Sequence, residues 1–292
     1  MALWFSSGTF QSKHVEGLLA EAAALGIEGI ELSSGMAYTD GLLGQVRAAY
    51  AAGTQCFLVH NYFPPPAEPF VLNVAALDEE SLLRSKILAR KAIQLAHDLG
   101  APFYSIHAGF AASLKPEQLG KPAQQAASLT ASDIDRDLAY EVMVQTVREL
   151  ADFAATLGLE LLVENNVISP LYLRLMPLNP LLLTEGTEIV RFFADVERTN
   201  VGLLLDVAHV KVSATALGFK PESFVDLVSE HVRCLHLSDN DGNEDSNQPF
   251  GEDAWFYSRL KDFSMCEIVV ESYNLEPQVM LSMQDLLQRS LA

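Results

Sequence analysis

The stretch Val201–Ser213, VGLLLDVAHVKVS, indicates the architecture of the whole chain. It opens with a run of aliphatic residues, as expected of a strand that is buried on both faces of a parallel sheet. The run ends in a carboxylate, Asp206, and an imidazole, His209, follows three positions later. A buried strand that delivers an acid and a histidine at its C-terminal end predicts a ligand site at that end of the sheet.

The same pattern recurs and predicts eight strands that alternate with amphipathic helices. The expected strands are Leu3–Ser7, Ile27–Ser33, Gln55–His60, Tyr104–His107, Leu159–Asn165, Val201–Asp206, Val232–Leu237 and Glu267–Glu271. The expected helices are Lys13–Leu25, Thr39–Ala52, Asp78–Leu99, Asp137–Leu157, Glu188–Arg198, Pro221–Glu230, Ala254–Leu260 and a terminal helix. This alternation predicts an α/β fold, the (β/α)8 TIM barrel, rather than a doubly wound sheet, for which the sequence lacks a G-x-G-x-x-G turn.

The length of 292 residues, with 49% hydrophobic content, provides apolar surface for one large domain, and we expect a single TIM-barrel domain over residues 1–292. Two connections are long for such a fold, at about 110–136 and 167–186. The first is a candidate lid. The prolines of the second predict a loop, yet it is rich in leucine. We therefore expect its apolar side chains to be buried, either against the barrel mouth or against the partner in a homo-oligomer.

Composition excludes several classes of function. With 19 basic against 38 acidic residues, the formal charge is -19, so we expect no nucleic-acid partner. The three cysteines, Cys56, Cys234 and Cys266, lie in or beside apolar segments, and we expect buried, reduced thiols and a cytoplasmic location. We expect no secretory signal in the first ten residues and no membrane span, because the sequence has no basic, apolar leader there and no long apolar run.

Metal-competent side chains gather at the predicted C-terminal strand ends, which share one face of a barrel. They are His60, His107, Glu164, Asp206, His209, His236 and Glu271. Each alone has an ordinary structural explanation, as a hydrogen-bonded core histidine or a helix cap. Together they would carry a heavy desolvation penalty in one cavity, which a divalent cation would remove. Glu160 and Glu267 begin their strands at the opposite end, so they are excluded from this site.

Four of these residues form a plausible metal shell. Glu164, Asp206, His236 and Glu271 would supply three oxygens and one nitrogen, which suits one divalent ion, Mn²⁺, Mg²⁺, Co²⁺ or Zn²⁺, and leaves positions open for substrate or water. No thiolate takes part, which argues against a structural zinc site.

Several motifs resemble one known group of proteins along essentially the whole chain. They are LVHNYF (His60), SIHAGF (His107), LLVENN (Glu164), LLLDVAH (Asp206, His209), CLHLSDNDG (His236) and IVVES (Glu271). The sequence resembles the xylose-isomerase-like TIM barrels, which include the sugar phosphate isomerase/epimerase proteins, the ketose 3-epimerases and endonuclease IV. In the epimerase branch, the resemblance implies that Glu164 and Glu271 bind the metal and exchange the substrate proton, and that His209 contacts substrate.

Chemistry supports a metal-dependent isomerase or epimerase of a sugar, sugar phosphate or related polyol ketone. Removing a proton from carbon beside a carbonyl requires a base and stabilisation of the enediolate oxygen, which a divalent cation supplies. Two opposed carboxylates, Glu164 and Glu271, would allow removal on one face and return on the other. A dehydratase of the inosose dehydratase type would use the same enediolate, and a non-catalytic binding barrel stays open.

The main rival is an endonuclease IV-like phosphodiesterase acting on abasic DNA. His60 and His107 match the additional histidines with which that family holds three zincs, so His60, His107 and His209 are expected to bind substrate or a second metal ion. That family also requires an Asp-x-His, and the corresponding place reads Asp245-Ser246-Asn247. An asparagine is a poor zinc ligand, and the net charge opposes DNA binding, so we expect the isomerase.

Overall fold

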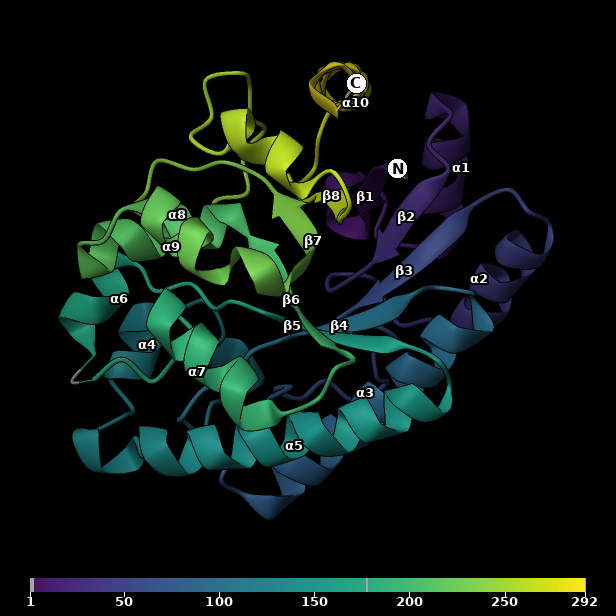
Figure 1. Ribbon diagram of the computed structural model, residues 1–292. Helices are drawn as coiled ribbons and strands as arrows, with labels where there is room; N and C mark the ends of the chain where they lie inside the picture. The colour runs from purple at the N-terminus through teal and green to yellow at the C-terminus, as the bar shows by residue number, and fades with distance from the viewer. Residues whose placement is uncertain (1–2, 177, 292) are drawn as a thin grey trace.

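A closed barrel of eight parallel strands forms the centre of the molecule, as Figure 1 shows for the computed structural model, which describes residues 3–176 and 178–291. Each strand pairs with its neighbour in sequence, and β8 closes the barrel by pairing with β1. The strands are β1 (Leu3–Ser6), β2 (Gly29–Leu32), β3 (Cys56–His60), β4 (Phe103–His107), β5 (Glu160–Glu164), β6 (Val201–Asp206), β7 (Val232–Leu237) and β8 (Glu267–Val270). The predicted TIM barrel is confirmed.

Helices surround the barrel on its outer side (Figure 1). They are α1 (Val15–Leu25), α2 (Leu42–Ala51), α3 (Glu79–Asp98), α4 (Pro122–Ala126), α5 (Arg136–Thr156), α6 (Pro170–Leu175), α7 (Gly186–Val196), α8 (Val207–Leu217), α9 (Pro221–Val228) and α10 (Pro277–Leu291). Short 3-10 turns lie at Ser7–Thr9, Pro116–Gln118, Ala131–Asp133, Ser229–His231 and Tyr257–Phe263. The α-helix predicted at Ala254–Leu260 is wrong, since the chain there forms the last of these 3-10 segments, shifted by three residues.

Burial of β6 explains why its sequence is so apolar. Every residue of Val201–Asp206 is buried, because the barrel interior covers one face and the helical layer covers the other. Full burial of each Leu or Val contributes about 1.5–3 kcal/mol, so the strand is held firmly in the core. Its final residue is therefore placed with little freedom at the barrel mouth.

Helix α8 begins directly after β6 and was not predicted. Asp206 is its N-cap: the carboxylate accepts a hydrogen bond from the backbone N–H of His209 at 2.8 Å. Valines and threonine make this helix a weak helix former by composition, but an aspartate cap and burial override that preference. His209 consequently lies on the first turn of a helix, beside the carboxylate that caps it.

Both long connections contain short helices. The first wall segment, residues 110–136, holds α4 and two 3-10 turns, and the second wall segment, residues 167–186, holds α6. They are joined to each other at several points. Phe110 and Leu181 form an antiparallel bridge, the Arg136 guanidinium donates to the Leu181 carbonyl, and the hydroxyl of Tyr172 donates to the side chain of Gln125. The two wall segments thus form one connected structure.

The cysteines are free, but only Cys234 is fully buried. Cys266 is partly buried and Cys56 is exposed, so the expectation of three buried thiols is wrong for Cys56, which begins β3 and lines the cavity at the N-terminal end of the barrel. Among the helices that the structure describes, none is long and apolar enough to cross a membrane.

Candidate metal centre

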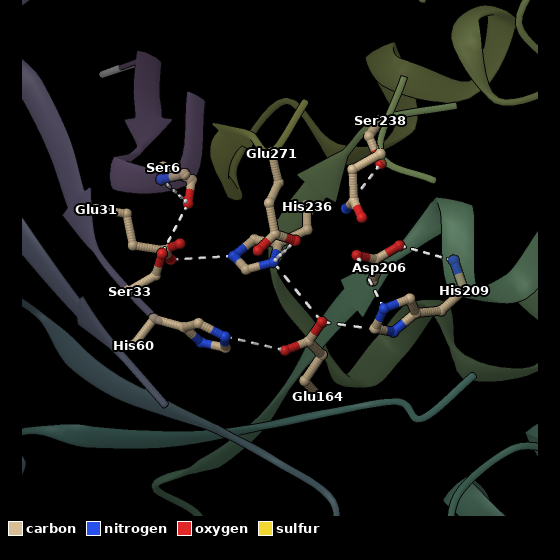
Figure 2. Close-up of polar contacts among 12 residues, drawn as sticks. Ser6, Glu31, Ser33, His60, Glu164, Asp206, His209, His236, Ser238 and Glu271 are labelled. Atoms are coloured by element: carbon tan, nitrogen blue, oxygen red, sulfur yellow. Dashed lines mark hydrogen bonds and ion pairs between the residues drawn. The ribbon is translucent and has the colours of Figure 1, made fainter. Parts of the chain in front are cut away.

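Four acidic and imidazole side chains meet at the C-terminal mouth of the barrel (Figure 2). Glu164 ends β5, Asp206 ends β6, His236 lies near the end of β7, and Glu271 follows β8 directly. All four are buried. Each offers one ligand atom, and these four atoms lie within 4.8 Å of one another. The structure brings together the four residues that the sequence predicts as a metal shell.

Several polar atoms of these four residues have no hydrogen-bond partner. Both oxygens of Glu164, Oδ2 of Asp206 and Nδ1 of His236 are buried and accept or donate no hydrogen bond. Nδ1 of His236 lies 2.8 Å from Glu271 and 3.7 Å from Glu164, close contacts without hydrogen-bond alignment. Ligands held at about 2.0–2.3 Å from one ion lie within about 4.5 Å of each other. The four residues therefore fit a divalent cation, which would give these orphaned atoms a common partner.

Two histidines adjoin this shell through Glu164. Nε2 of His60, from β3, lies 3.3 Å from the Glu164 carboxylate, and Nε2 of His107, from β4, lies 3.1 Å from it. The Ser105 hydroxyl, 2.9 Å from Nδ1, fixes the His60 ring. Ligand atoms of His60, His107 and Glu164 also lie within 4.8 Å of one another, so this trio is a second metal-competent group that shares one carboxylate with the first.

His209 lies on the other side of Glu164, at the start of α8. Its Nδ1 is 2.8 Å from the carbonyl oxygen of Asn165, and its Nε2 is 3.2 Å from the carboxylate of Asp245. The rings of His209 and His107 have centroids 5.9 Å apart. All three histidines that were predicted to bind substrate or a second metal ion therefore surround the same carboxylate.

Asp245 is a contact that the sequence analysis placed in a motif but did not assign to the site. Its Oδ1 is buried without a hydrogen-bond partner, beside His209. Asn247, two residues later, is buried and its amide donates to the Ser238 hydroxyl at 3.4 Å. The Asn247 amide thus contacts Ser238, the residue that follows β7, and does not form a ligand cluster with Asp245.

Glu31 of β2 also contacts the site, although the sequence did not predict it as a site residue. It is fully buried, and its Oε2 lies 3.0 Å from Nε2 of His236, on the far side of the ring from Glu271. The predicted site contained residues at or after the ends of strands, whereas Glu31 lies one residue before Leu32, the last residue of its strand. A carboxylate between Ile30 and Leu32, inside a strand predicted to be buried, was the feature of the sequence that could have indicated a role in the site.

Electrostatics within the cluster divide the four histidines into two pairs. Burial lowers the pKa of His107 and lowers that of His60 to about 3, so the His60 ring is neutral and able to accept a hydrogen bond or bind a metal ion. Burial also opposes the charged forms of His236 and His209, but neighbouring carboxylates outweigh it and raise the pKa of both well above the ordinary value. Burial raises the pKa of Asp206 well above its usual range. Without a cation, the cluster therefore favours protons on His209, His236 and Asp206.

Two cavities flank the cluster. The first wall segment lines both of them, and the second wall segment lines one. One, of about 360 Å³, reaches His107 and is lined by Tyr62, Phe70 and Phe110. The other, of about 430 Å³, reaches Asp245 and is lined by Gln125 and Tyr172. A larger cavity of about 660 Å³ lies at the opposite end of the barrel and contains none of the predicted site residues. The cavities that adjoin the cluster therefore lie at the C-terminal mouth of the barrel.

The family model for xylose isomerase-like TIM barrels matches residues 19–288. The chain belongs to this family. A fructoselysine 3-epimerase of Shigella flexneri is 21% identical over 253 residues, which cover 84% of this chain and 80% of that protein.

Among solved structures, a D-tagatose 3-epimerase-like protein superposes with a TM-score of 0.73 at 18% identity, covering 100% of this chain and 97% of that one. A D-psicose 3-epimerase from Clostridium cellulolyticum H10, solved with D-tagatose, gives 0.65 at 16% identity, covering 100% of this chain and 94% of that one. At these identities the two structures show a shared fold. The family membership and these sugar epimerase relatives make this chain a sugar epimerase- or isomerase-like TIM barrel.

Proposed function

We propose that this chain is a metal-dependent isomerase or epimerase of a sugar, sugar phosphate or related polyol ketone, acting by proton transfer beside a carbonyl. The observation that carries the proposal is the convergence of Glu164 and Glu271. In Figure 2 Glu271 enters from above and Glu164 from below, and both carboxylates face Nδ1 of His236, at 2.8 and 3.7 Å. The ligand atoms of the two carboxylates lie within 4.8 Å of each other. Two carboxylates placed in this way suit removal of a proton on one face of a substrate carbon and its return on the other.

Glu164, Asp206, His236 and Glu271 would hold the ion. When bound, a divalent cation supplies Lewis-acid stabilisation of the oxygen that becomes negative as the proton leaves. One carboxylate takes the proton, the C–H electron pair moves towards the carbonyl oxygen, and the opposite carboxylic acid returns a proton to carbon. Epimerisation results when removal and return use different faces of one carbon. Isomerisation results when the returned proton goes to the neighbouring carbon and the hydroxyl proton passes from one oxygen to the other.

The surrounding histidines would orient the substrate. His60 is neutral, and His107, whose side chain is 36% exposed, faces the cavity from which substrate enters. His60, His107 and His209 would bind substrate hydroxyls or, with Glu164, a second ion. No lysine or arginine is among the described residues that line the two flanking cavities, which favours an unphosphorylated sugar within the proposed range.

The features of Asn247 weigh against the abasic-DNA nuclease. Its amide donates to Ser238, whereas that rival needs a histidine ligand at this place. The formal charge of -19 also opposes tracking of phosphates. We infer a small carbohydrate partner, no nucleic acid and a cytoplasmic protein. A homo-oligomer would cover leucines of the second wall segment that remain exposed, such as Leu171 and Leu178.

Deuterium incorporation tests the proposal directly. The Mn²⁺- or Co²⁺-loaded chain should exchange one carbon-bound proton of a ketose in D₂O, detected by NMR and by a product mass increased by one unit. A product lighter by one water would instead identify a dehydratase. Failure to exchange any member of a broad panel of ketoses and ketose phosphates, together with nicking of an abasic-site duplex, would overturn the proposal in favour of the nuclease.

A further inference from the structure

Glu31 occupies a buried position where an apolar side chain would have a smaller desolvation cost. It projects from β2 into the barrel and is 0% exposed. Oε2 contacts Nε2 of His236 at 3.0 Å, whereas Oε1 has no hydrogen-bond partner. A buried carboxylate with one interaction carries a desolvation penalty that this contact does not offset. Packing alone therefore does not account for a glutamate here.

The two nitrogens of His236 face different surroundings. Nδ1 points to the proposed metal shell, 2.8 Å from Glu271 and 3.7 Å from Glu164, and Nε2 points away from it to Glu31 (Figure 2). A neutral imidazole ligates a metal through the nitrogen without a proton. A carboxylate that accepts the proton of Nε2 leaves the lone pair of Nδ1 directed at the shell and makes it a better ligand.

We propose that Glu31 is a positioning residue that sets the ring orientation of His236 and selects Nδ1 as its metal-binding nitrogen. This inference rests on the proposed function, because it assumes that the shell binds a divalent cation. It extends the site by one layer and adds β2 to the strands that build it. Glu31 itself does not reach the reacting atoms, since the His236 ring lies between it and the shell.

The chain offers a matched control for this role. Glu267, at the other end of the barrel, accepts the indole N–H of Trp4 at 2.6 Å. Like Glu31, Glu267 lies in a strand and its carboxylate contacts a ring nitrogen. Unlike Glu31, it lies far from the shell, at the start of β8. Glu267→Gln therefore measures the effect of losing a carboxylate–ring contact without any effect on a metal ligand.

The test measures metal affinity in the absence of substrate. The full chain, stripped with EDTA, is titrated calorimetrically with Mn²⁺, and Co²⁺ binding is followed by its visible absorption. Loss of an outer-shell carboxylate typically weakens binding by about 10–100-fold. We expect Glu31→Ala to raise Kd by that factor, Glu31→Gln to raise it about 10-fold, and Glu267→Gln to leave it within twofold of wild type.

The outcomes separate this inference from the proposed function. If wild type binds Mn²⁺ and Glu31→Gln binds it equally well, the inference is overturned and the proposed function stands. If wild type binds no Mn²⁺ or Co²⁺, both are overturned. A purely structural role for Glu31 would lower the Tm of the metal-free variants and leave Kd unchanged, which also overturns the inference.

A measurement on wild type covers the case in which the Glu31 variants do not fold. In ¹⁵N-histidine spectra of the Zn²⁺-loaded chain, with His236 assigned by His236→Gln, we expect the signal of Nδ1 to move to a metal-bound position while Nε2 keeps its proton. A spectrum in which Nε2 is bound to Zn²⁺, or carries no proton, would overturn the proposed role of Glu31.

Discussion

Asp206→Asn separates two contacts that one carboxylate makes. One oxygen caps α8 by accepting the N–H of His209 at 2.8 Å, and the other, Oδ2, is buried without a hydrogen-bond partner at the shell. Asparagine is as good an N-cap as aspartate, so the helix start is kept while the charge is removed. Asparagine leaves a polar atom in the place of Oδ2, but it removes the buried charge, whose desolvation raises the pKa of Asp206 well above its usual range. Removing this charge should stabilise the metal-free chain by about 1–3 kcal/mol. At about 2 °C per kcal/mol for a chain of this size, the Tm rises by about 2–6 °C.

Bound metal should make wild type more stable than Asp206→Asn, the reverse of the order expected without metal. Scanning calorimetry at pH 7 is run in EDTA and then with Mn²⁺ at 1,000 times the wild-type Kd, where one bound ion adds about 4 kcal/mol to wild type. Asp206→Asn, which has lost an anionic ligand, gains much less. Asp206→Ala is the control for the cap, because it removes charge and cap together and should lie about 1 kcal/mol below Asp206→Asn in EDTA.

A metal-free Asp206→Asn protein that melts below wild type would refute this reasoning, since it would mean that Oδ2 is stabilised without a cation. Equal Mn²⁺ stabilisation of the two proteins would refute the placement of Asp206 in the shell.

Three further results are expected. Glu164→Gln and Glu271→Gln should each slow deuterium exchange by about 10²–10⁴-fold, measured by NMR, whereas Glu160→Gln and Glu267→Gln, at the opposite ends of the same strands, should leave the rate within a few-fold. The raised pKa of His236 means that its charged form stabilises the fold, fully so below pH 6.5, and that this stability is lost as the pH rises through the folded-state pKa. The Tm of the metal-free chain should therefore fall as the pH is raised above 6.5, and a Tm that rises there contradicts the assignment. Free ketoses should exchange faster than their phosphates at equal concentration, because no basic side chain among the described residues lines the flanking cavities, and a preference for phosphates would contradict that expectation.

Strand positions were predictable because the barrel buries strands on both faces. Val201–Asp206 and Val232–Leu237 match the structure at both ends, since each apolar run is bounded by polar residues. Helix α8 was missed because its valines favour strands by propensity, and the feature that starts it, the cap by Asp206, was interpreted only as a ligand.

Site residues at strand ends could be predicted, and residues that act from within a strand or through a loop could not. Glu31 lies one residue before its strand ends, and its partner His236 is 205 positions away in sequence. Asp245 contacts His209 through a loop whose path depends on the folded barrel. No local pattern encodes such long-range pairings, which arise when the barrel closes.

The joined wall segments constrain how this protein could acquire a different substrate. Arg136 ties the end of the first to Leu181 in the second, and Tyr172 of the second binds Gln125 of the first. A loop graft that exchanges only one of them breaks these ties and leaves buried polar groups facing an unmatched surface. We therefore expect the substrate range under the proposed function to depend on both segments together, and a chimera should exchange both of them while leaving the strand ends unchanged.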